Sequence, residues 1–81
     1  MSEPEYNMNE ITQIYVYLLD EGTNVWRPVW AKSLGNSLFE ITSINQDTED
    51  EKWQFSYGDV VRCEKKSLSS ENCLVAVEKI R

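Results

Sequence analysis

The chain has 81 residues, of which 41% are hydrophobic and 27% charged, and its formal net charge is −6. These values are typical of an ordinary globular protein, and the length has room for one domain with a modest core. The longest uninterrupted apolar run, Ile14 to Leu19, is far shorter than the roughly 20 residues of a membrane-spanning helix. The first ten residues, MSEPEYNMNE, lack the basic and apolar regions of a signal peptide, so we expect a cytoplasmic protein.

The balance of charge argues against two classes of partner. Acidic residues number 14 against 8 basic ones, and only Lys65 and Lys66 are adjacent. Proteins that bind polyanions carry a basic stripe that displaces counterions from phosphates. We therefore expect no nucleic-acid partner and no membrane partner. An acidic protein of this size is better suited to bind a basic protein.

The residue types also argue against catalysis. Histidine is absent, which removes the side chain best suited to proton transfer near neutral pH and the commonest metal ligand. Cys63 and Cys73 are too few for a structural zinc site, and a cysteine nucleophile would lack an imidazole base. We expect no enzyme, no cofactor and no metal. Both thiols are expected to be reduced, although their predicted strands flank one loop and a cross-strand disulfide stays an alternative.

Strand signals begin after residues 1–10, which we expect to be a mobile acidic arm preceding a single domain at residues 11–81. ITQIYVYLLD is β-branched and aromatic and ends at the turn signal Asp20-Glu21-Gly22. NVWRPVWAKSL follows and ends at Gly35-Asn36, a pair typical of a tight hairpin. Pro28 cannot donate to a ladder and predicts an edge, a bulge or a bend in this second strand. A bulge there would shift the period, so that Trp26 and Trp30 need not share a face.

The second half of the chain predicts three more strands. SLFEITSI alternates clearly, and the charged loop NQDTEDE follows, with a helical turn plausible between Asp47 and Trp53. KWQFSYGDVVRCEKK reads as one strand with a kink at Gly58-Asp59, where Asp59 is expected to accept hydrogen bonds from the turn backbone. The polar loop SLSSEN leads to the last strand, CLVAVEKI. Gly22 and Gly58 are expected to supply turn conformations that other residues avoid.

Five strands with short connections predict an all-β fold. Closing a small sheet into a barrel removes its open edges. We therefore expect a single-domain, five-stranded, strongly bent barrel. A five-stranded oligonucleotide-binding barrel is the alternative, although such domains are usually longer and more basic.

The stretches EGTNVWRPV and WQFSYGDVV resemble a family of small, mostly uncharacterised bacterial proteins. The similarity extends from Tyr15 to Val77 and implies a Src-homology-3-like β-barrel. Members occur in settings that imply accessory or immunity-like binding roles. The resemblance implies no catalytic chemistry.

The first two strands have more apolar residues than one small barrel can enclose. Some must therefore lie outside, and tyrosine and tryptophan tolerate this because each has a polar tip. The residues expected inside are Ile14, Val16, Leu18, Val25, Val29, Leu38 or Phe39, Ile41, Val61, Val75 and Val77. The candidate partner-binding residues are Tyr15, Tyr17, Asp20, Glu21, Trp26, Arg27 and Trp30.

These observations predict a non-enzymatic protein-binding module with an immunity- or adaptor-like role. An exposed aromatic patch beside acidic loops is also how Src-homology-3 domains hold proline-rich peptides, but a shared architecture does not imply a shared ligand. Arg27 is expected to pair with Asp20, Glu21 or Asp59, or to stack on a tryptophan. The alternatives are an accessory subunit or small domain supporting an enzyme, and rings that cover the barrel or form a homodimer contact.

Overall fold

The computed structural model describes residues 11–45, 51–68 and 70–81, and these form six strands and no helix. The strands are β1 (Ile11–Leu19), β2 (Trp26–Gly35), β3 (Leu38–Ile41), β4 (Lys52–Trp53), β5 (Val60–Leu68) and β6 (Glu71–Lys79). The all-β prediction is confirmed. The predicted arm at 1–10, and residues 47–50 of the predicted helical turn, lie outside the described residues.

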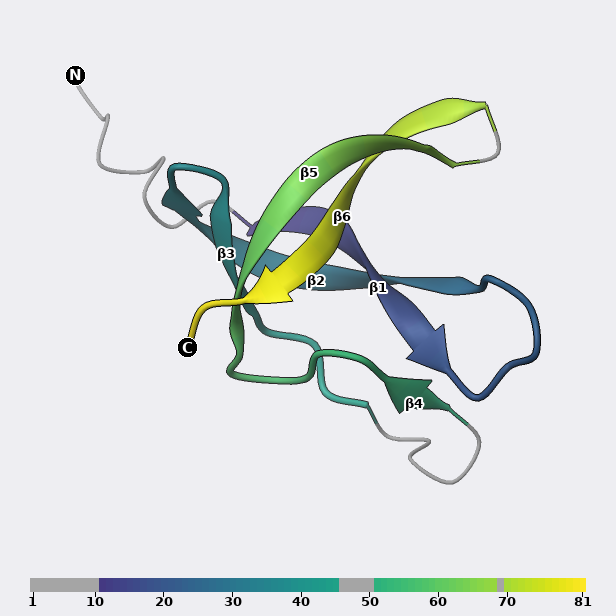
Figure 1. Ribbon diagram of the computed structural model, residues 1–81. Coiled ribbons are helices and arrows are strands. Elements are labelled where there is room, and N and C mark those ends of the chain that lie inside the picture. Colours follow the sequence, from purple (N-terminus) through teal and green to yellow (C-terminus); the bar gives the residue numbers. More distant parts are fainter. Residues whose placement is uncertain (1–10, 46–50, 69) are drawn as a thin grey trace, which may run out of the picture.

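Five of the six strands close into a ring (Figure 1). Neighbouring strands follow the order β2, β3, β5, β6 and β1, and β1 pairs again with β2. All of these pairings are antiparallel except β1 with β6, which pair in parallel at Tyr15 and Val75. The short β4 adds to the end of β1. The prediction of a small five-stranded closed sheet is confirmed, but the far half of the β5–β6 hairpin extends past the ring.

The core lies inside the ring and follows the alternation of the strands. Ile14, Val16 and Leu18 of β1 point inward, and Val29 and Ala31 of β2 face them. The other buried hydrophobic residues are Phe39, Ile41, Phe55, Val60, Val61, Cys63, Val75 and Ala76. Most of the predicted interior is confirmed, with Phe39 rather than Leu38 as the buried member of its pair.

Two predicted core residues are half-buried instead. Val25 precedes β2, where its carbonyl accepts the backbone N–H of Leu18. Val77 lies at a bulge, because Arg62 pairs with Glu78 while the next residue, Cys63, pairs with Ala76. The bulge reverses the alternation of β6, so that Val75 and Ala76 are both buried.

The segment predicted as one kinked strand is two strands joined by a loop. β4 ends at Trp53 and β5 begins at Val60. Gly58 has a φ of 87°, a conformation that L side chains rarely adopt, and the Asp59 carboxylate accepts the backbone N–H of Ser56 at 3.0 Å. Both turn roles predicted from the sequence are confirmed, and so is that of Gly22, with a φ of 79°.

The β2–β3 hairpin turns one residue later than predicted. Its two turn residues are Asn36 and Ser37, with φ values of 57° and 64°, the signs required by a type I′ turn. Ser33 pairs with Phe39 and Gly35 with Leu38, so Leu34 is an extra residue in β2. The glycine thus precedes the turn, and a serine occupies a left-handed position that glycine would favour.

Replacing Ser37 by glycine is therefore expected to stabilise the fold by about 0.5–1 kcal/mol. Asn-Gly is the preferred pair for this turn type, and the backbone carbonyl that accepts the Cys63 N–H is retained. The measurement is urea unfolding followed by far-UV circular dichroism. Ser37→Ala is the control, since it keeps the left-handed strain; equal or lower stability of Ser37→Gly would contradict the assignment of strain.

Pro28 lies where β2 has a partner strand on one side only. It is opposite Tyr15 of β1, whereas pairing with β3 begins at Ala31. Of the edge, bulge or bend predicted for Pro28, the structure shows an edge. No bulge interrupts the β1–β2 register between Trp26 and Lys32, so Trp26 and Trp30 lie on one face.

Candidate functional site

The outer face of the β1–β2 ribbon carries a row of large rings. Tyr17 is opposite Trp26, Tyr15 is opposite Pro28, and Gln13 is opposite Trp30. Their sequence neighbours Ile14, Val16 and Val29 point into the core, so these residues point away from it. We name Tyr15, Tyr17, Trp26, Pro28 and Trp30 the outer strip. The four aromatic residues predicted as a partner surface are thus brought together.

One end of the outer strip is a packed aromatic pair. The ring centroids of Tyr17 and Trp26 lie 5.1 Å apart with planes at 67°, an edge-to-face geometry. The Tyr17 hydroxyl donates a hydrogen bond to Oδ1 of Asn24 at 3.0 Å. Both rings are half-buried. Their positions are therefore fixed before any partner binds.

The other end is Trp30, whose ring is open to solvent. Trp30 is 53% exposed, but hydrogen bonds to residues 42 and 43 hold its backbone in place. Its N–H donates to Oγ of Ser43 at 2.8 Å, and its carbonyl accepts the Thr42 N–H at 2.9 Å and the Thr42 hydroxyl at 3.1 Å. A large exposed ring on a fixed backbone loses little entropy on binding.

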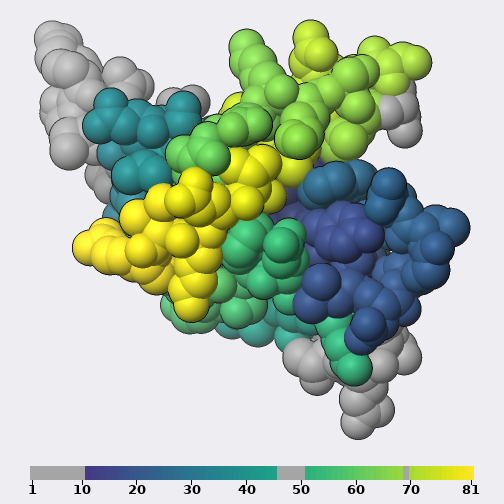
Figure 2. All heavy atoms as spheres, viewed as in Figure 1, coloured from purple at the N-terminus to yellow at the C-terminus, as the bar shows by residue number. Residues whose placement is uncertain are grey.

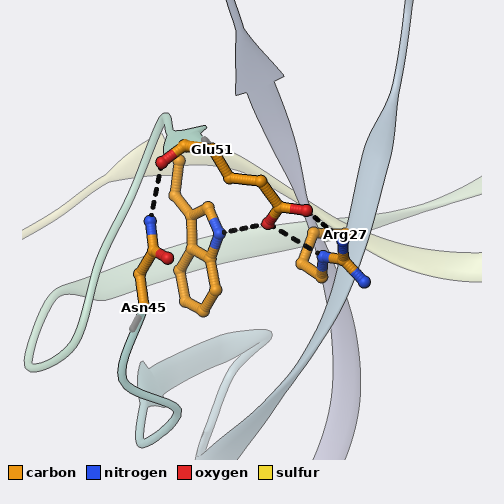
Figure 3. A network of polar contacts seen from close by, with 4 residues as sticks. Arg27, Asn45 and Glu51 are labelled. Atoms are coloured by element: carbon orange, nitrogen blue, oxygen red, sulfur yellow. Dashed lines mark hydrogen bonds and ion pairs between the residues drawn. The ribbon is translucent and has the colours of Figure 1, made fainter. Parts of the chain in front are cut away.

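Arg27 lies on the opposite side of β2 from the outer strip. It pairs with Val16 in register and forms a bidentate ion pair with Glu51. Glu51 also accepts the indole N–H of Trp53 at 3.1 Å, and its backbone carbonyl accepts the Asn45 side-chain amide at 2.9 Å (Figure 3). The prediction that Arg27 pairs with a carboxylate is confirmed. The predicted partners Asp20, Glu21 and Asp59 were wrong, because the carboxylate that it contacts is that of Glu51.

This network ties β2 to the segment around β4. The hydrogen bonds from Arg27 and Trp53 hold the pKa of the Glu51 carboxyl below its usual range. The carboxylate therefore stays charged at neutral pH and keeps both donors in place. The arrangement assigns Arg27 a structural role, and its side chain does not join the outer strip.

Asp20 and Glu21 lie in the exposed loop between β1 and β2. Asp20 has a φ of 61° and its carboxylate lies 3.7 Å from Nζ of Lys52. The loop follows directly from the strand that carries Tyr17 and returns to Trp26. The two carboxylates thus belong to the same end of the ribbon as the aromatic pair.

A hollow of about 320 Å³ lies between the outer strip and the β5–β6 hairpin. Its lining residues are Tyr15, Asn24, Val25, Trp26, Leu68, Glu71 and Cys73. Figure 2 shows the hairpin end, in yellow-green, beside the blue atoms of β1 and β2. Glu71 and Cys73 were not predicted as site residues, because nothing in the sequence indicated that this hairpin lies beside β1. Asn24, in the loop between β1 and β2, was not predicted either.

The two cysteines are free and do not face one another. Cys63 is opposite Ala76 and Cys73 is opposite Lys66, so the cross-strand disulfide is not formed. Burial raises the pKa of the Cys63 thiol to about 12. Cys73 is half-buried at the hollow. In the described part of the chain no three His, Cys, Asp or Glu side chains come together as a metal site.

We expect the two thiols to react at very different rates. At pH 8 a thiol reagent should modify Cys73 in the native protein well before Cys63, since the thiolate is the reactive form and Cys63 forms it rarely. After denaturation without reductant both should react. The measurement is mass spectrometry of the modified peptides over time, and equal native rates, or thiols blocked in the denatured chain, would contradict the prediction.

The chain matches no family model, no curated protein and no solved structure. No helix long and apolar enough to cross a membrane occurs among residues 11–45, 51–68 and 70–81. The candidate site is thus defined by its geometry.

Proposed function

We propose that this protein acts by binding another protein through the outer strip. The observation that carries the proposal is the placement of four aromatic rings and a proline on one outward face, with Trp30 more than half exposed. Aromatic side chains with a polar tip dominate the energetics of protein interfaces. The backbone bonds at Trp30 and the Tyr17–Trp26 pair support a preorganised surface.

The partner proposed is a basic protein. The net charge of −6 favours association with a positively charged surface. Asp20 and Glu21 lie at one end of the outer strip, and Glu71 lies across the hollow from it. The role is that of a non-enzymatic, immunity- or adaptor-like module in the cytoplasm.

We also infer a distant relationship to Src-homology-3-like barrels. It is supported by the closed ring of five strands and by the positive φ values of Gly22 and Gly58 within the motifs EGTNVWRPV and WQFSYGDVV. The relationship would concern architecture and not ligand choice.

Capture from a lysate of the source cells tests the proposal. Immobilised wild-type protein, Trp30→Ala and Leu34→Ala are compared side by side; Leu34 is a matched control because it is a large exposed residue of the same strand, at 40%. A partner should be retained by the wild type and by Leu34→Ala and lost with Trp30→Ala. Equal retention by all three would contradict the assigned surface.

A further inference from the structure

The hollow beside the outer strip combines aromatic walls with negative charge. Tyr15 and Trp26 line it from the β1–β2 ribbon, and Leu68, Glu71 and Cys73 line it from the β5–β6 hairpin. Asn24 adds an amide whose Oδ1 already accepts the Tyr17 hydroxyl. Among the described residues that line it, the hollow thus has apolar sides, one carboxylate and no basic residue.

The Glu71 carboxylate is the charge in the hollow that favours a cation. Partial desolvation, followed by the nearby Cys73 thiol and the Glu71 carboxylate, raises the pKa of the Tyr15 phenol. Desolvation disfavours a charge of either sign, whereas the carboxylate disfavours an anion and attracts a cation. An ammonium or guanidinium group is attracted by aromatic faces and by a carboxylate.

We propose that this hollow binds a lysine or arginine side chain of the partner. The proposal rests on the function proposed above and specifies its chemistry. The apolar stem of such a side chain would pack against Tyr15, Trp26 and Leu68, and its charged end would approach Glu71. The volume of about 320 Å³ is at the lower end for small-ligand pockets and is large enough to admit one such side chain.

The hollow also explains how the outer strip could select a basic partner. Trp26 belongs both to the strip and to the wall of the hollow. A partner ring or aliphatic group on Trp30 and a cationic side chain in the hollow would then be held by one continuous surface. Aromatic contact would contribute affinity, and the cation would contribute specificity.

Small-molecule probes test the cation site without the partner. The probes are the N-acetyl methylamides of lysine, arginine and norleucine, the last being neutral and of similar length. Binding is followed by the indole N–H signals in ¹H–¹⁵N spectra, assigned with Trp26→Phe and Trp30→Phe. The lysine or arginine probe should shift the Trp26 signal until it saturates, with an affinity at least threefold higher than that of the norleucine probe. The Trp30 signal should not move. Whichever of the lysine and arginine probes has the higher affinity identifies the preferred cation.

Glu71→Gln supplies the matching variant, with Glu40→Gln as a control of equal charge change on β3. Glu71→Gln should weaken the cationic probe at least threefold, and Glu40→Gln should leave it unchanged. Equal binding of norleucine and the cations, or no effect of Glu71→Gln, would overturn the cation site. If the probe experiment fails but capture of the partner still depends on Trp30, only the cation site is wrong and the proposed function stands. If capture does not depend on Trp30, the proposed function is overturned.

Discussion

Replacement of Trp53 by alanine is expected to lower the free energy of unfolding by about 3 kcal/mol, the lower end for removal of a packed tryptophan. Trp53 packs against the core cluster, and its indole N–H donates to Glu51 at 3.1 Å. Alanine would remove that packing and one of the donors to the Glu51 carboxylate. Because Glu51 also receives Arg27, the connection between β2 and the β4 segment would weaken as well.

The measurement is thermal and urea unfolding followed by far-UV circular dichroism. For a domain of this size a loss of about 3 kcal/mol lowers the melting temperature by more than about 10 °C. Trp53→Phe is the control; it keeps most of the packing and loses only the hydrogen bond, so we expect a cost of about 1 kcal/mol. A Trp53→Ala variant within 1 kcal/mol of the wild type would show that the ring contributes little to the core.

Replacement of Trp30 by alanine is expected to lower the affinity for the partner strongly and the stability of the fold only slightly. Its stability cost should stay below about 1 kcal/mol, because the ring is 53% exposed and its backbone bonds do not depend on the side chain. Affinity for the captured partner should fall by about 2 kcal/mol, or roughly 30-fold, as expected for an exposed aromatic anchor.

Urea unfolding measures the loss of stability, and titration calorimetry with the purified partner measures the loss of affinity. The comparison with Trp53→Ala is direct, since both variants replace a tryptophan by alanine in the same small fold. If Trp30→Ala destabilises the protein as much as Trp53→Ala, the ring is structural and the outer strip loses its anchor.

The fold class followed from the sequence because alternation and turn residues are local signals. Ile14, Val16 and Leu18 were predicted inside because they alternate with tyrosines, whose polar tips tolerate the outer face, and they are buried. The hairpin turn was misplaced by one residue, because Gly35-Asn36 is a stronger local signal than Asn36-Ser37, the pair that has the positive φ values of the turn.

The remaining errors come from interactions between distant segments. Val77 was predicted inside, but the bulge opposite Arg62 and Cys63 reverses the alternation of β6. The Glu51 partner of Arg27 is 24 residues away in the sequence, and the carboxylates of Asp20, Glu21 and Asp59 offered equally plausible pairs. Only the closed ring shows which one faces the guanidinium.

The aromatic residues of the candidate surface could be predicted in part from the sequence, and the hollow beside them could not. The sequence indicated that some aromatic residues of the first two strands must lie outside, and the uninterrupted β1–β2 register places four of them on one face. The hollow was not predictable, because it depends on the parallel contact of β1 with β6 at Tyr15 and Val75. That contact brings Glu71 and Cys73 beside the outer strip.

The indole N–H signals of the three tryptophans provide the most direct test of the outer strip as the binding surface. Trp26 and Trp30 lie on the strip, whereas the Trp53 indole donates to Glu51 on the other side of β2. In ¹H–¹⁵N spectra recorded while the captured partner is added, we predict that the Trp26 and Trp30 signals shift or broaden and that Trp53 keeps its position. A complex in which Trp53 alone responds, or in which neither strip signal changes, would contradict this assignment.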